Sequence, residues 1–242
     1  MSSRFRPRFS AASGLLAGVL LWQAVAWRAG VLVLPGPDAV ALRLPALLAT
    51  PATWAALAAT ARDALGGLAL GGAVGLAAGL AGGASRTLGA ALAPVATVLL
   101  GVPQIAWVVL ALMAFGPTGG ANVATVAVAC APMLFLGAWH GMRARDPALA
   151  EMARVFRLPT ALRLAEVVLP QIASHVRAAL ATALGLSFKV AVMSEVLGGG
   201  LGVGGRIATA RAYLETDLVL AWIVLTVALL LALQAVAGRL LR

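Results

Sequence analysis

The acidic side chains and histidines of this chain are few and widely spaced, and they offer little catalytic chemistry. Four aspartates and four glutamates are scattered over 242 residues, with no carboxylate pair of the kind that hydrolases use for general acid and base work. His140 and His175 lack metal-like spacing to each other or to a carboxylate. We interpret both as polar residues at an interface, so the sequence supports neither a metal site nor an enzyme.

ATP chemistry is also absent from the sequence. A phosphate-cradling Walker loop needs a lysine after glycine and before serine or threonine, whereas the only lysine of the chain, Lys189, follows Phe188. The chain is therefore not expected to hydrolyse ATP by the P-loop route or to hold a cofactor of its own.

A glycine-rich run, GGGLGVGG at 198–205, contains a formal dinucleotide motif at Gly200, Gly202 and Gly205. Such a motif binds nucleotide only where it follows a strand of a βαβ unit, and here it follows an apolar helical pattern. We interpret the run as a flexible outer connection between two helices.

Composition identifies the elements that must carry these residues. With 62% hydrophobic residues, 11% charged residues and a mean hydropathy of +1.00, the chain has the composition of a polytopic membrane protein. A helix crosses the bilayer with about 20 apolar residues. The sequence predicts an all-α membrane protein with six such spans, at 11–27, 64–81, 90–115, 121–139, 172–197 and 218–237.

Three of these spans have distinctive residues. The third contains Pro94, Pro103 and Gln104, which predict a kink or local unwinding. Cys130 in the fourth is the only cysteine, so we expect it to serve packing. The first follows several arginines and ends with an apolar run and Ala24-Val25-Ala26, like a signal peptide, but it is long enough to span and we expect it to be retained.

The net charge of +10 is explained by basic loops on the cytoplasmic side, without nucleic acid. Both termini in the cytoplasm would place twelve of the eighteen basic residues there. Residues 28–63 would then form a proline-containing outer loop, with a helix start near Thr50-Pro51.

The second span has a glycine every four residues, at Gly67, Gly71, Gly75, Gly79 and Gly83. On a helix these form a smooth groove along one face that lets another backbone approach closely. We favour helix packing in the bundle or at a dimer contact over a compositional accident.

Lys189 and Glu195 lie within the fifth span, where ionisable groups are costly and usually face an aqueous path or a bundle interior. Six residues separate them, so they project from different faces and an ion pair within the helix is not expected. We hypothesise that Lys189 faces a cavity and favours an anionic solute, with Gln104, Ser187, Ser194 and Glu195 as further polar groups of the path. The alternative is a structural cation paired with carbonyls of another helix or of a dimer mate.

A charged segment at 143–163 interrupts the apolar sequence. Asp146 and Pro147 predict a helix start, and residues 148–156 can form a helix that Leu158-Pro159 ends. The next helix is expected to be capped by Thr160. The first helix carries an apolar stripe at i, i+3, i+4 and i+7 spacing, suited to docking in a partner's groove or to lying in lipid headgroups: Leu149, Met152, Ala153 and Phe156.

This segment carries Glu151-Met152-Ala153 and is followed by Val167-Val168-Leu169-Pro170, whose Pro170 lies nineteen residues after Glu151. On these residues it resembles the EAA loop of ATP-binding-cassette importer permeases. Segments that are similar to the nitrate, sulfonate, taurine and bicarbonate branch of this family extend the resemblance from about residue 64 to the C-terminus: 102–107, 114–116, 183–189, 194–197 and 215–218. Arg157 stands where the family usually has glycine, and Met152 replaces an alanine.

The resemblance implies a five-helix type I importer core at 64–242, with an EAA-like coupling loop at 143–170, preceded by an N-terminal helix and periplasmic loop at 1–63. It implies a homodimeric, multi-pass permease in the bacterial inner membrane. Two copies of a separate ATPase, which bind ATP and Mg²⁺, would receive the coupling helix, and a periplasmic or lipid-anchored binding protein would deliver the solute. The coupling residues would be Leu149, Glu151, Met152, Ala153, Phe156, Arg157 and Pro170.

The expected function is passage of a small nutrient, an anion such as a sulfonate, taurine, nitrate or bicarbonate, or a solute like a thiamine precursor. Two alternatives remain at this point. A self-sufficient channel or secondary transporter would move solute without an ATPase, although the spans carry no series of acids that would serve as a proton relay. A membrane scaffold would have no transport role.

Overall fold

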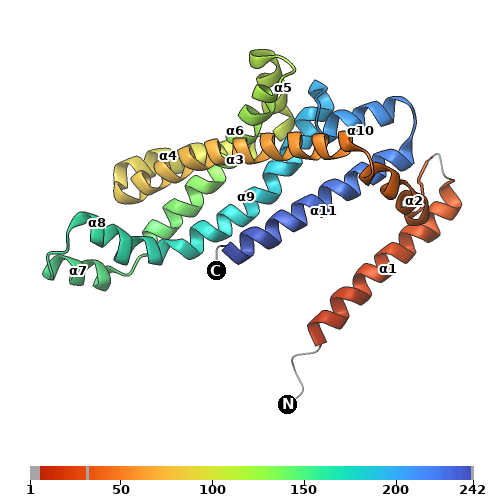
Figure 1. Cartoon of the computed structure of the whole chain (residues 1–242). Coiled ribbons are helices and arrows are strands. Elements are labelled where there is room, and N and C mark those ends of the chain that lie inside the picture. Colours follow the sequence, from red (N-terminus) through yellow and green to blue (C-terminus); the bar gives the residue numbers. More distant parts are fainter. Residues whose placement is uncertain (1–5, 31–32, 241–242) are drawn as a thin grey trace.

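The computed structural model describes residues 6–30 and 33–240, and this part of the chain forms helices joined by short turns, with no strand. Figure 1 shows the helices in chain order, with α7 and α8 at one end of the molecule and α5 and α10 toward the other. The helices are α1 Arg6–Ala29, α2 Pro37–Leu48, α3 Pro51–Ala84, α4 Arg86–Gly101, α5 Gln104–Phe115, α6 Gly119–Arg143, α7 Pro147–Val155, α8 Thr160–Leu162, the π turn η1 Arg163–Val168, α9 Leu169–Gly198, α10 Val203–Ala212 and α11 Thr216–Leu240.

Helices α3, α6 and α9 form the centre of the bundle. The most apolar window of α6 is 61% buried, against 17% for that of α11, so α6 lies inside and α11 lies at the periphery. Leu68 of α3, Leu134 of α6 and Phe188 of α9 share one buried cluster. Many large apolar side chains outside it are exposed, as expected of helices that face lipid.

The glycines of α3 lie directly against α6. A methyl group added at Gly71 or Gly75 would collide with the carbonyl oxygens of Ala127 and Ala131, and one at Gly79 would lie 2.5 Å from that of Phe135. A methyl group at Gly67 would collide with the side chain of Val126. The absence of side chains at these positions lets the two backbones approach closely.

Residues 28–63 are not the outer loop that the sequence predicted. Helix α2 occupies much of this segment, and α3 begins at Pro51 and continues for 34 residues, so the boundary expected at residue 63 falls within a helix. The helix start near Thr50-Pro51 is confirmed, because Pro51 at the first position needs no backbone hydrogen bond. A 2.6 Å ion pair between Arg43 and Asp217 ties α2 to α11, and this bond raises the pKa of Arg43 above its ordinary value.

The kink expected in the third span is confirmed as a complete break. Helices α4 and α5 meet at an angle of 93°, with Val102 and Pro103 in extended conformations between them. Pro103 has no N–H to continue the ladder and restricts the residue before it.

Four helices of the described chain are long and apolar enough to cross a membrane, and the bent α4–α5 pair raises the number to five if it forms one span. The four correspond to the predicted second, fourth, fifth and sixth spans. Helix α1 covers the first predicted span but is not among the four.

Candidate functional site

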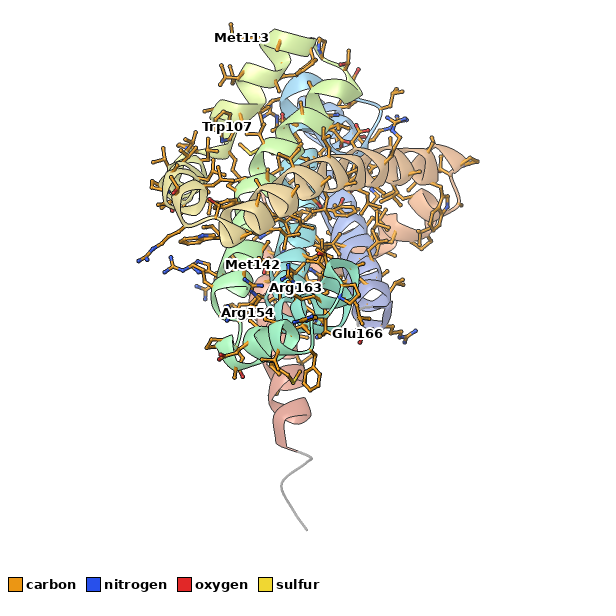
Figure 2. All side chains as sticks on the ribbon, turned by 90° about the vertical axis from the view of Figure 1, so that its left-hand side faces the viewer. Trp107, Met113, Met142, Arg154, Arg163 and Glu166 are labelled. Atoms are coloured by element: carbon orange, nitrogen blue, oxygen red, sulfur yellow. The ribbon has the colours of Figure 1, made fainter. Side chains whose placement is uncertain are left out.

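Helix α7 is the short amphipathic helix that the charged segment predicted. The side chain of Asp146 accepts a hydrogen bond of 2.8 Å from the backbone N–H of Ala148, and Pro147 occupies the first turn, so the predicted start is confirmed. Helix α7 packs against η1 at the end of the molecule. Figure 2 shows Arg154, Arg163 and Glu166 together at this end, far from Trp107 and Met113.

The exposed apolar face of α7 differs from the predicted stripe at two positions. Leu149, Met152 and Phe156 are exposed, as docking would require, but Ala153 is 1% exposed and is buried within the chain itself. Val155, which the stripe omitted, is 74% exposed. A nine-residue helix that packs on one side presents a narrower face than its sequence pattern suggests, because the i+4 position turns inward.

Arg157, which stands where the resemblance led us to expect glycine, forms the turn that ends α7. Its φ is +50°, in the left-handed region where a side chain is unfavourable. The N–H of Arg157 donates to the carbonyl of Arg154, and the N–H of Leu158 donates to that of Ala153, each at 3.0 Å. These two bonds form a Schellman motif, so the helix ends by backbone geometry before Pro159 is reached.

The segment after this turn is continuous with the fifth span. Thr160 is the first residue of α8 and makes no capping hydrogen bond with its side chain, so the expected Thr160 cap is wrong. The chain then forms the π turn η1, in which the N–H of Leu169 bonds the carbonyl of Leu164 five residues earlier. Pro170 follows directly and lacks an N–H, which disturbs the ordinary helical ladder at this point.

Glu195 lies at the opposite end of α9, in a buried junction of three helices. Its carboxylate, 1% exposed, accepts the hydroxyl of Thr60 of α3 at 2.8 and 2.9 Å and the backbone N–H of Gly204 of α10 at 2.8 Å. The hydroxyl of Thr60 in turn accepts the N–H of Val203 at 2.8 Å. The carboxylate therefore satisfies the N-terminus of α10.

The glycine-rich run connects α9 to α10, as the sequence predicted, but it packs closely around this carboxylate and its last three residues begin a helix. Gly204 and Gly205 are buried in the first turn of α10. A methyl group at Gly202 would collide with the carboxylate of Glu195, and one at Gly205 would collide with the carbonyl of Gly200. Close approach of backbone explains the glycines, without a nucleotide.

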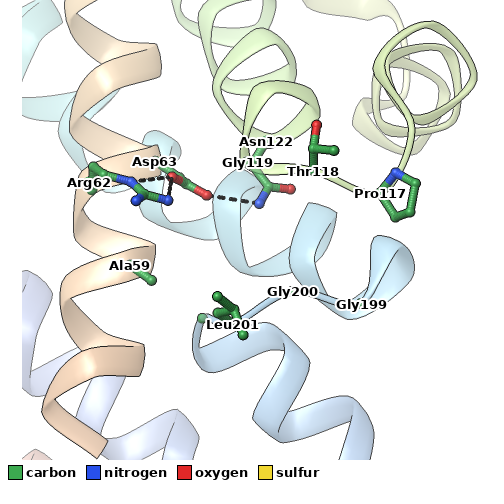
Figure 3. Close-up of a pocket in the computed structure, with 11 residues that line it drawn as sticks. Ala59, Arg62, Asp63, Pro117, Thr118, Gly119, Asn122, Gly199, Gly200 and Leu201 are labelled. Carbon is green, nitrogen blue, oxygen red and sulfur yellow. Dashed lines mark hydrogen bonds and ion pairs between the residues drawn. The ribbon is translucent and has the colours of Figure 1, made fainter. Parts of the chain in front are cut away.

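A second buried polar chain lies beside the first. The amide of Asn122 donates to Asp63 at 2.9 Å and accepts the hydroxyl of Ser194 at 2.7 Å, while Arg62 donates to the other oxygen of Asp63 at 3.0 and 3.1 Å. Figure 3 shows Arg62, Asp63 and Asn122 at a pocket of about 440 Å³. Arg62 is 74% exposed at the side chain and Asp63 is 5% exposed, so a cation faces the pocket and a carboxylate anchors it.

Lys189 lies apart from these buried groups. It is exposed on α9 in an otherwise apolar groove of about 260 Å³ between α9, α10 and α11, and it forms no ion pair with any described residue. Ser187 is fully buried and bonds the carbonyl of Leu184 within its own helix. Gln104 is half-buried at the start of α5. The structure therefore joins Ser194 and Glu195 to neighbouring helices but does not gather the five expected path residues into one site within a single chain.

Four polar residues of these two junctions were not predicted as site residues from the sequence: Thr60, Arg62, Asp63 and Asn122. Asp63 was one of only eight acidic residues, and a carboxylate inside a 34-residue apolar helix was a usable signal. The partnership of Thr60 with Glu195 had no signal, because 135 residues separate them.

Comparison with known proteins shows the family of the chain. Residues 71–242 match the family model described as "Binding-protein-dependent transport system inner membrane component". A relative in Escherichia coli named as an aliphatic sulfonates transport permease, SsuC, is 32% identical over 226 residues, covering 92% of this chain and 85% of that protein.

Two further matches extend the comparison. The bicarbonate transport system permease CmpB of Synechococcus elongatus is 28% identical, covering 79% of this chain and 73% of that protein. A crystal structure of an amino acid ABC transporter has the same fold, with a TM-score of 0.62 at 20% identity, covering 82% of this chain and 94% of that one. The chain therefore belongs to the binding-protein-dependent transport inner-membrane family, in its sulfonate, nitrate and bicarbonate branch, and is a permease subunit of an ABC importer.

Proposed function

We propose that this permease forms, as a homodimer, the path by which a small oxyanion enters the cytoplasm. The relatives support an oxyanion, because the names of SsuC, CmpB and the nitrate import permease NrtB refer to sulfonates, bicarbonate and nitrate. In this arrangement the bent α4–α5 pair forms one span and α1 adds a sixth, with both termini in the cytoplasm.

The observation that carries the proposal is the exposed Lys189 in a membrane-spanning helix. Its groove contributes no carboxylate, and a lone cation facing lipid at this depth is costly. An aqueous path between two copies of the chain removes that cost and gives an anion a counter-charge. Gln104 and the buried Ser187, Ser194 and Glu195 would shape the path from within each subunit.

ATP would act on this path through α7. On each chain of the homodimer, the exposed Leu149, Met152 and Phe156 would offer an apolar face to one ATPase subunit. Glu151 adds a hydrogen-bond acceptor beside this face. Arg157 and Pro170 would set the turn and the connection to α9. A binding protein would deliver the solute at the opposite end, next to the pocket of Figure 3.

The direct test is uptake by the assembled importer in proteoliposomes, with methanesulfonate, nitrate and bicarbonate as the solutes. Lys189→Met should abolish uptake of the transported anion while ATPase co-purification and dimer assembly persist, and Lys189→Arg should retain much of it because the charge remains. Unchanged uptake by Lys189→Met would contradict the role of this lysine.

A secondary transporter is the alternative function that the relatives disfavour. It predicts that the permease alone, in liposomes without ATPase or ATP, moves the same anions. We expect no uptake under those conditions.

A further inference from the structure

A second pocket, of about 320 Å³, lies at the base of the coupling loop. It is enclosed by the ends of α3 and α6, by α7, by η1 and by the start of α9. Three arginines line it, each from a different segment: Arg145 from the α6–α7 connection, Arg154 from α7 and Arg163 from η1. Figure 2 shows Arg154 and Arg163 close to Met142, another residue of the lining.

The positive charge of this pocket is poorly balanced. Neither Arg154 nor Arg163 forms an ion pair within the described part of the chain, and Arg145 donates only its Nε, to the carbonyl of Met142 at 2.9 Å. Asp146 is the only carboxylate of the lining, and one of its oxygens already caps α7. Glu151 and Glu166 lie on the same elements without lining the pocket.

The pocket also joins parts of the chain that must move relative to each other if α7 transmits force. Gln171 bridges the pocket wall, since its side chain accepts the N–H of Asp146 at 2.8 Å and donates to the carbonyl of Val167 at 2.7 Å. The wall opposite α7 is the π turn, a geometry that is often found at functional sites. A ligand held by all three arginines would fasten α7 to η1 and α6.

We propose that this pocket binds a tetrahedral oxyanion of the sulfate or phosphate type and thereby holds the coupling helix in place. Guanidinium groups are weakly hydrated, and their paired N–H donors match the oxygens of such anions. Occupancy by a cytoplasmic oxyanion would slow coupling when internal anion is abundant. This regulatory consequence rests on the proposed function and orientation, whereas binding itself does not.

Thermal unfolding of the purified permease in phosphatidylcholine nanodiscs tests the binding. Sodium sulfate should raise Tm above the value in sodium chloride of equal ionic strength. Arg154→Gln and Arg163→Gln should each weaken the apparent sulfate affinity about tenfold, because each removes a charged hydrogen-bond donor. Arg239→Gln, a change of an exposed arginine of α11 outside the pocket, should leave the affinity unchanged.

The proposal would be overturned if sulfate raised the Tm of the wild type and of the Arg154→Gln/Arg163→Gln double variant equally. It would also be overturned if chloride raised the Tm of the wild type as much as sulfate does. Nanodiscs with phosphatidylglycerol distinguish the source of the anion. Loss of the sulfate effect in them, together with a Tm in sodium chloride that is already raised for the wild type but not for the Arg154→Gln/Arg163→Gln variant, would identify a lipid phosphate as the occupant. Persistence of the sulfate effect would identify a soluble oxyanion. Both outcomes support the site.

An acidic side chain of the ATPase is the competing occupant. It predicts no sulfate effect, together with loss of ATPase co-purification in Arg154→Gln and Arg163→Gln while the apolar face of α7 is intact. Those two results together would overturn the oxyanion proposal and identify the ATPase side chain as the occupant. Failure of the sulfate test leaves the Lys189 uptake experiment unaffected, so the two proposals fail separately.

Discussion

At its C-terminal end α9 buries Ser194 and Glu195 in hydrogen bonds to α3, α6 and α10, whereas at its N-terminal end it continues through a π turn into a segment whose arginines are exposed. The first end is fixed by satisfied buried polar groups, which are costly to break. The second is held mainly by one helix packed on η1 and by the side chain of Gln171. We therefore expect this long helix to join an element that shifts to a junction that stays in place.

Removal of the buried carboxylate should have the largest effect on stability. Glu195→Ala leaves the hydroxyl of Thr60 and the N–H of Gly204 without an acceptor, which should lower the free energy of unfolding by about 3 kcal/mol. Thermal unfolding in detergent measures it. Glu166→Ala, at an exposed glutamate of η1, is the matched control and should change stability little; equal losses would remove the distinction between the two ends.

The contact of α3 with α6 should be the next most sensitive. Gly71→Ala places a methyl group against the carbonyl of Ala127, and such overpacking should cost about 2 kcal/mol. Gly66→Ala is the control on the same helix, since its methyl group would lie 3.6 Å from Val123 and alanine favours helix. A Gly71→Ala variant as stable as Gly66→Ala would show that the two helices can separate.

Changes on the face of α7 should reduce ATPase binding with little effect on folding. In the double variant Met152→Asp/Phe156→Asp both altered side chains are exposed, at 45% and 71%. The free energy of unfolding of the permease should therefore change by no more than about 0.5 kcal/mol. Co-purification of the ATPase should be lost. Leu162→Asp, at an exposed leucine beyond α7, should retain the ATPase, and equal loss there would indicate nonspecific disruption.

A local effect, confined to α7, is expected at the turn that ends this helix. Arg157→Gly removes the strain of a side chain at φ +50° and should stabilise the turn by about 1 kcal/mol, whereas Arg157→Val should destabilise it. Amide hydrogen exchange of α7 is the measurement. Slower exchange in Arg157→Val than in Arg157→Gly would contradict the assigned backbone geometry.

Features set by local sequence were predictable. Apolar length predicted α3, α6, α9 and α11, prolines predicted the break before α5, and Asp146-Pro147 predicted the start of α7. Helix α10 was missed because glycine is a poor helix former, and the glycine at 204 is explained by its close approach to the backbone of Val192 and Val196 and to the side chain of Glu195.

The candidate site was harder to predict because its bonds join distant segments. Asn122 lies 59 residues from Asp63 and 72 from Ser194, and no spacing rule links positions so far apart. The inward turn of Ala153 likewise depends on where α7 packs, which the periodicity of one short helix cannot specify.

The central claim is that force enters at α7 and passes along α9 to a junction that stays intact. Hydrogen exchange of the complete importer, with and without ATP and vanadate, tests it most directly. The account predicts that nucleotide changes exchange at 147–168 and leaves the amides around Glu195 and Gly204 protected in both states. Unchanged exchange at 147–168, or opening of the Glu195 junction instead, would contradict it.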